Sequence, residues 1–165
     1  MITVSIDNSQ IERAKELYPF DNLNGSITKG KSNIFGAIGE VIINDYFKDK
    51  GQTIDTNSTY DYDLIINSYK VDVKTKRFTP KFKPNNNWNV TVSDFNTTQQ
   101  CNYYFFVGVS EDYKRACMYG YITPGEFYNK ATFNKKGQID PTGNGVWTFK
   151  DDCYNLKIAE LTEFK

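Results

Sequence analysis

The clearest pattern of apolar and polar positions in the chain predicts a β-hairpin. The apolar run 64–66 is followed by the polar pair 67–68, and apolar residues then alternate with polar ones over 69–76. This arrangement is typical of two antiparallel strands joined by a two-residue turn. With that turn, the strands pair so that Asp63 lies directly opposite Asp72 on one face of the hairpin.

Two carboxylates in that position need a positive charge between them. The Cβ atoms of such a pair lie about 4.5–5.5 Å apart, and like charges at this distance destabilise a hairpin. A divalent cation would relieve the repulsion, and Lys74 adds an amine on the same face, two residues after Asp72. Asp61 is a second candidate ligand, but in this register it faces Lys74, where an ion pair explains it. We therefore choose Asp63.

A helix is predicted upstream of the hairpin. Apolar residues recur at helical spacing over 32–50, and Gly51 provides a stop signal. Gly36 and Gly39 lie inside this helix, where each costs roughly 1 kcal/mol relative to alanine. This cost indicates a close approach of the helix to a sheet. Glu40 follows Gly36 by four residues, on the side that the glycine leaves open.

Weaker patterns complete a mixed sheet with flanking helices. Residues 9–18 predict a helix capped by Asn8 or Ser9, residues 93–100 a short helix, and Pro124 the start of another. The remaining expected strands are 52–56, 88–92, 103–109, 116–122, 146–149 and 154–158.

The composition is that of one folded domain, which we expect to cover residues 1–165 with a core at about 32–123. The chain has 165 residues, of which 16% are aromatic, so it can bury a core. No apolar run approaches the roughly 18 residues of a membrane span. The three cysteines are too scattered for a disulfide framework or zinc site. We expect a cytoplasmic protein, within a bacterial host if this Asn-, Lys- and Ile-rich chain is phage-encoded.

The absence of histidine excludes several classes of enzyme. Ser–His–Asp and Cys–His hydrolases, histidine-ligated zinc hydrolases and nucleases with a histidine base are all removed. The 20 basic and 20 acidic residues balance, so no global attraction to nucleic acid or membrane is expected. Any chemistry must depend on carboxylates, lysine and tyrosine.

One local cluster of positive charge follows the hairpin. Beside a metal site it predicts a phosphate-binding surface, and the alternative is an ordinary solvated loop. Its members, within a stretch that contains no acid, are Lys74, Lys76, Arg77, Lys81 and Lys83. Lys29 and Lys31 would extend it from the start of the predicted helix. Three nearby aromatic residues are candidates for base stacking or for core packing: Phe78, Phe82 and Trp88.

Taken alone, residues 71–76 fit an ordinary half-buried strand. In combination, the motifs resemble the PD-(D/E)XK, or restriction-endonuclease-like, nuclease superfamily. The matching residues are Glu40 on the helix, Asp63 at the start of one strand and 72–74 (Asp-Val-Lys) on the next. The resemblance covers about residues 32–76. A tyrosine replaces the usual proline before the first aspartate, and an aspartate replaces the more frequent glutamate of the second motif.

The resemblance implies an α/β fold, a restriction-endonuclease-like mixed β-sheet flanked by helices in a single domain. It implies a Mg²⁺-dependent DNA endonuclease that leaves 5′-phosphates, with Mn²⁺ able to substitute. The expected catalytic residues are Glu40, Asp63, Asp72 and Lys74. The expected metal ligands are Asp63, Asp72, Glu40 and the backbone carbonyl of Val73. Gln99 or Gln100 is an expected accessory residue.

Duplex or branched DNA is the expected substrate, and cutting both strands would call for a homodimer. Two alternatives stay open. The first is a catalytically inactive DNA-binding or protein-interaction module with the same fold. The second is a phage structural or host-interaction protein in which the pairing of the two aspartates is coincidental.

Overall fold

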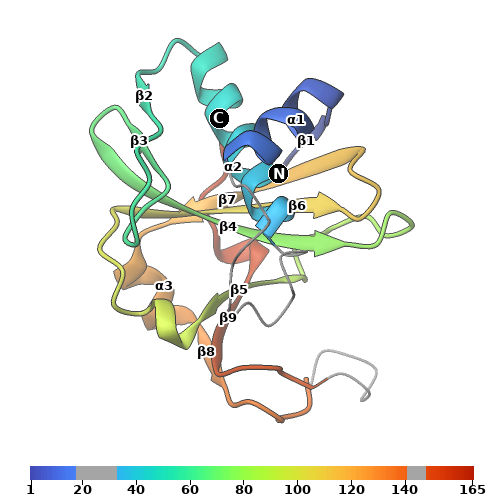
Figure 1. Ribbon diagram of the computed structural model, residues 1–165. Coiled ribbons are helices and arrows are strands. Elements are labelled where there is room, and N and C mark those ends of the chain that lie inside the picture. The colour runs from blue at the N-terminus through green and yellow to red at the C-terminus, as the bar shows by residue number, and fades with distance from the viewer. Residues whose placement is uncertain (18–32, 141–147) are drawn as a thin grey trace.

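A six-stranded mixed β-sheet forms the centre of the computed structural model, which describes residues 1–17, 33–140 and 148–165 (Figure 1). The strand order is β1-β7-β6-β4-β3-β2. Strands β4 and β6 run parallel, and every other neighbouring pair in this sheet is antiparallel. The strands are β1 (Ile2–Ser5), β2 (Ile54–Asp55), β3 (Leu64–Ile66), β4 (Tyr69–Phe78), β6 (Tyr103–Ser110) and β7 (Arg115–Ile122).

Two helices, α1 (Asn8–Leu17) and α2 (Asn33–Asp49), cover one face of this sheet (Figure 1). The apolar side of α2 packs on the valines of β4 and β6, as expected for an amphipathic helix on a sheet. Arg13 and Asp45 join the helices through two hydrogen bonds of 2.8 and 2.6 Å. Helix α2 is therefore fixed from both sides.

A second, three-stranded sheet lies against the other face (Figure 1). Its order is β5-β9-β8, and a second apolar cluster fills the space between the two sheets. Its elements and neighbours are β5 (Asn89–Ser93), β8 (Thr132–Asn134), β9 (Cys153–Lys157), α3 (Pro124–Lys130) and the 3₁₀ turns η1 (Asp94–Asn96) and η2 (Ile158–Glu160). The predicted mixed α/β fold with flanking helices is confirmed at this level.

The predicted hairpin is confirmed, including its turn. Asn67 and Ser68 have φ angles of 48° and 72°, as the two central residues of a type I′ turn require. The ladder pairs Leu64 with Val71, which is the predicted register. The pairing ends there, so the further pair predicted between the two aspartates is not part of the ladder.

The two glycines of α2 have different roles. A Cβ at Gly39 would overlap the Thr75 hydroxyl on β4, so this glycine permits the close approach of helix to sheet. A Cβ at Gly36 would meet no described atom within 4 Å. The prediction that close packing explains both glycines is therefore right for Gly39 and wrong for Gly36.

Several predicted elements differ from those observed. The cap of α1 is Asp7, whose carboxylate accepts the Gln10 N–H at 2.9 Å, and not Asn8 or Ser9. The helix expected over 93–100 is the single turn η1, because it ends at Asn96.

Sheet pairing at long range accounts for the other differences. Strands β1 and β8 were not predicted, and both are short strands at sheet edges. Residues 146 and 147 of the strand expected over 146–149 lie outside the described residues, and Thr148 forms an isolated bridge with Ile139. None of the helices in the described ranges is long and apolar enough to cross a membrane.

Candidate active site

The site forms just before the start of β3, where β4 has no partner on the β3 side and keeps only its pairing with β6. The Asp63 N–H donates to the Val71 carbonyl at 2.9 Å, and the Asp63 Oδ2 atom accepts the Val73 N–H at 2.7 Å. The Asp63 carboxylate thus accepts the Val73 N–H, which has no backbone partner on this side because β3 does not extend this far. Because the N–H and C=O of one strand residue point to the same side, the Val73 carbonyl also faces Asp63.

Asp72 lies beside Asp63, on the next strand. Its side chain is 4% exposed, and its Oδ2 atom lies 2.6 Å from the Nζ atom of Lys74, which is 14% exposed. Within the described part of the chain, this oxygen has no hydrogen bond of ordinary geometry, so the ammonium group is its charge partner. A charge buried in this way is tolerated because it is paired.

A second acceptor holds Lys74 in place. Its Nζ atom donates to the Oε1 atom of Gln99 at 2.9 Å, and the Nε2 atom of Gln99 donates to the Tyr60 carbonyl at 2.7 Å. The ammonium group also lies 5.7 Å from the centre of the Tyr104 ring. The side chain of Lys74 is therefore fixed in direction before any substrate binds.

Of the two glutamines predicted near the site, Gln99 reaches it. The backbone N–H of Gln100 donates to Asp61 at 3.1 Å, and its exposed side chain has no such contact in the described ranges. The predicted ion pair between Asp61 and Lys74 is therefore wrong. The loop folds so that Lys74 pairs with Asp72, and Asp61 accepts a backbone N–H instead.

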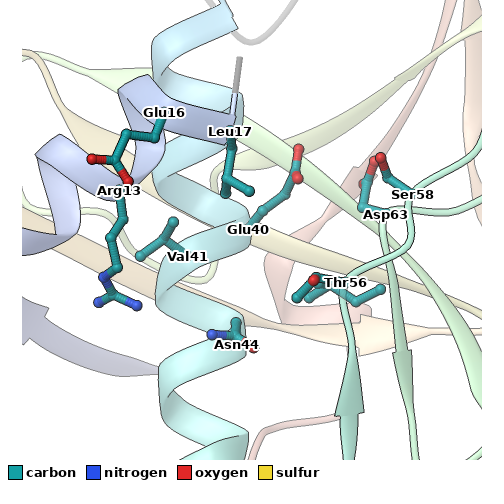
Figure 2. Close-up of a pocket in the computed structure, with 10 residues that line it drawn as sticks. Arg13, Glu16, Leu17, Glu40, Val41, Asn44, Thr56, Ser58 and Asp63 are labelled. Carbon is teal, nitrogen blue, oxygen red and sulfur yellow. The ribbon is translucent and has the colours of Figure 1, made fainter. Parts of the chain in front are cut away.

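Glu40 approaches the same place from helix α2. Figure 2 shows its carboxylate extending from the helix toward Asp63 and Ser58. These three residues line an open pocket of about 370 Å³ between α1, α2 and the segment that precedes β3. The structure thus brings together Glu40, Asp63, Asp72 and Lys74, the four predicted catalytic residues.

The crowding of carboxylates has an electrostatic consequence. Burial, followed by the negative charges of Glu40 and Asp72, raises the pKa of Asp63 from 3.8 to about 8. The hydrogen bond from Val73 opposes this shift but does not cancel it. At neutral pH Asp63 therefore carries a proton. A cation bound to the cluster would offset the same negative charge.

No group of three or more His, Cys, Asp or Glu side chains in the described ranges is arranged to hold a metal ion. Two carboxylates do lie side by side, since Asp63 and Asp72 are within hydrogen-bonding reach of each other. Mg²⁺ often takes one or two protein carboxylates and completes its octahedron with water and phosphate oxygens. The donor set of oxygens fits such an ion.

The predicted phosphate-binding residues are spread along the end of β4 and the loop after it. Lys76, Lys81 and Lys83 are exposed. Arg77 lies 3.9 Å from Glu111, which offsets part of its charge. Lys31 lies outside the described residues. The cluster is thus an exposed basic surface that begins two residues after Lys74.

The aromatic residues near the site divide into core and surface. Phe78 is 4% exposed and belongs to the core, and the partly buried Trp88 packs edge-on against it. Phe82 is 51% exposed on the basic loop. Sequence reasoning missed Tyr60 and Phe95, which are 61% and 71% exposed. Their position in loops rich in polar residues is the signal that was available, since a loop aromatic has no strand to pack in.

The Tyr60 hydroxyl donates to the Phe95 carbonyl at 3.1 Å, so these two loops are joined beside the site.

Compared with known proteins, the chain matches no family model, no curated protein and no solved structure.

Proposed function

We propose that the protein is a divalent-metal-dependent nuclease of the restriction-endonuclease-like class that hydrolyses phosphodiester bonds in DNA. The observation that carries the proposal is the meeting of two carboxylates and a lysine beside the start of β3. Asp72 is buried with Lys74 at 2.6 Å, and the Val73 N–H holds Asp63 beside it. The order of Glu40, Asp63 and the Asp-Val-Lys motif along the chain adds support through the PD-(D/E)XK resemblance.

The metal fits the oxygen donors of this cluster. Asp63 and Asp72 would hold Mg²⁺ or Mn²⁺, with Glu40 and the Val73 carbonyl as further donors. When bound, the cation would polarise the scissile phosphate and lower the pKa of an attacking water. Its charge would also oppose the burial and the repulsion that together raise the pKa of Asp63.

Lys74 has the properties that phosphoryl chemistry needs from a side chain. It is a compact positive charge that Asp72 and Gln99 already hold in one direction. A charge fixed in advance stabilises the negative charge that develops on phosphate oxygens without reorganisation cost. Gln99 acts through Lys74 and is a positioning residue.

The basic surface after β4 would bind the phosphate backbone on either side of the cut. Lys76, Lys81 and Lys83 carry its exposed charges, and binding through them is expected to weaken as salt rises. The described residues form one such cluster, so cutting both strands of duplex or branched DNA would need two copies related by a two-fold axis.

Cleavage of defined DNA substrates tests the proposal. Single-stranded, duplex and branched oligonucleotides are incubated with the protein in Mg²⁺ or in EDTA, and the new ends are analysed for 5′-phosphate. We expect cleavage in Mg²⁺ with 5′-phosphate ends, and none in EDTA. If the folded protein binds these DNAs but cuts none of them with Mg²⁺ or Mn²⁺, the alternative of an inactive binding module holds instead.

A further inference from the structure

A groove between the two sheets opens directly beside the candidate active site. It has a volume of about 690 Å³, within the usual range for small-ligand sites. Strand β4 forms its floor and contributes Lys74 and Lys76, while β5 contributes Val90 and Thr91 to its wall. Because Lys74 belongs to both, a ligand in the groove would be adjacent to the reacting phosphate.

The floor of the groove offers charge for a phosphate group. Lys74 and Lys76 lie on the same face of β4, since they are two residues apart. Lys76 is an exposed residue, but its tip folds back so that Nζ donates to the Asn89 carbonyl at 3.1 Å, and burial of this ammonium group lowers its pKa. Among the ion pairs of the described residues, none involves Lys76. The charge of Asp140 acts on this ammonium group, which keeps N–H donors for an anion beyond the one that Asn89 accepts.

The groove also offers a partner for a planar ring. Phe95, on η1 at the rim, is 71% exposed. Tyr119 lines the interior, but its buried hydroxyl packs against Gly108 and is closed to a ligand. An exposed aromatic ring at the edge of a groove is suited to stacking with a base.

The active site fixes the position of this rim. Gln99 connects Lys74 to the Tyr60 carbonyl, and the Tyr60 hydroxyl donates to the Phe95 carbonyl at 3.1 Å. A chain of hydrogen bonds thus joins the ammonium group at the reacting centre to the loop that carries the exposed ring. A base stacked on Phe95 would lie at a fixed distance from the phosphate at Lys74.

We propose that this groove binds one unpaired nucleotide next to the scissile phosphate, with its base stacked on Phe95 and its phosphate between Lys74 and Lys76. The inference rests on the proposed nuclease function and deepens it, because it names the substrate as a nucleic acid with a single-stranded segment at the cut. A fully paired base is stacked inside its duplex and presents no free face to Phe95. Frayed ends, flaps and branch points present one.

Binding measurements without cleavage test the groove. Fluorescence anisotropy in EDTA gives the affinity of the protein for a labelled single strand, for the same strand lacking one base, and for a blunt duplex of the same sequence. The variants are Phe95→Ala and Tyr119→Phe, which removes one hydroxyl. Phe133→Ala is the matched control, because Phe133 is an exposed aromatic on β8 that does not line the groove.

We expect Phe95→Ala to weaken single-strand binding about 5- to 100-fold, the loss typical of one base–aromatic stack. Tyr119→Phe, which removes a hydroxyl buried against Gly108, and Phe133→Ala should both leave it unchanged. The strand lacking a base should bind the parent protein more weakly but lose nothing further with Phe95→Ala.

Two results would overturn the inference, and they differ in what they imply for the proposed nuclease function. In the first, Phe95→Ala and the parent bind single strands with equal affinity, and the protein cleaves duplex DNA in Mg²⁺. This result would reject the nucleotide-binding role of the groove and keep the proposed nuclease function. In the second, the folded protein binds none of the three DNAs and cleaves none in Mg²⁺. This result would reject both the role of the groove and the proposed nuclease function.

Discussion

Replacing Asp63 with asparagine should change how the stability of the protein depends on pH. Unfolded, Asp63 releases its proton near its ordinary pKa of 3.8; folded, it does so at about 8. Between these values folding takes up one proton, so the free energy of unfolding falls as pH rises, by about 1.4 kcal/mol per pH unit. Above the folded pKa the loss is complete.

The total effect is large relative to the stability of a small domain. Four pH units at that slope give a loss of up to about 6 kcal/mol between low and high pH, against a typical domain stability of about 5–15 kcal/mol. Asparagine retains the oxygen that accepts the Val73 N–H but has no charge to repel Glu40 and Asp72. The Asp63→Asn protein should therefore be more stable than the parent at about pH 8 and similar at about pH 4.

Urea unfolding in EDTA, followed by intrinsic fluorescence at a series of pH values, measures this difference. The chain contains no histidine, so no histidine titration adds to the change in the free energy of unfolding over this pH range. Asp61→Asn is the matched control, since it neutralises a nearby aspartate that accepts a single backbone N–H from Gln100. The reasoning is refuted if Asp63→Asn keeps the same pH slope as the parent, or if both asparagine variants remove it equally.

Three further predictions follow from contacts around the site. Gly39→Ala should lower the free energy of unfolding by about 1–3 kcal/mol through overlap with β4, whereas Gly36→Ala should raise it by up to about 1 kcal/mol; equal effects in urea unfolding would contradict the assigned packing. Gln99→Ala should slow Mg²⁺-dependent cleavage with little change in DNA affinity, and Gln100→Ala should not; equal rates for both variants would show that Lys74 needs no such support. Lys74→Ala should lower the free energy of unfolding of the metal-free protein by about 3–5 kcal/mol, because the buried Asp72 carboxylate loses its partner. Mg²⁺ should restore part of this stability in thermal unfolding. Unchanged stability of the metal-free variant would mean that the pair is not buried.

The hairpin could be predicted from sequence because its determinants are local. The polar pair at 67–68 specifies a two-residue turn, and the turn alone sets which residues face each other on β3 and β4. The meeting of Asp63, Asp72 and Lys74 follows from that register. A slip by one residue would have placed the motif on opposite faces.

The rest of the site depends on contacts that local patterns do not carry. Asp63 lies outside the ladder because β3 begins only at Leu64, which is decided by the loop before it. The choice of Gln99 over Gln100 follows from how that region meets Tyr60, far away in sequence. The groove exists because β5 pairs with β9, and such long-range pairing leaves no signature in either segment alone.

Incubation of supercoiled plasmid with the protein at low salt, in Mg²⁺ and in EDTA, shows whether this cluster cuts DNA. We expect nicked or linear DNA in Mg²⁺, none in EDTA, and none with a folded variant that combines Asp72→Ala and Lys74→Ala. Cleavage that persists in this double variant would place the active site elsewhere. Intact plasmid under all conditions, with the folded protein also inactive on branched and single-stranded DNA, would contradict the claim that this cluster hydrolyses DNA.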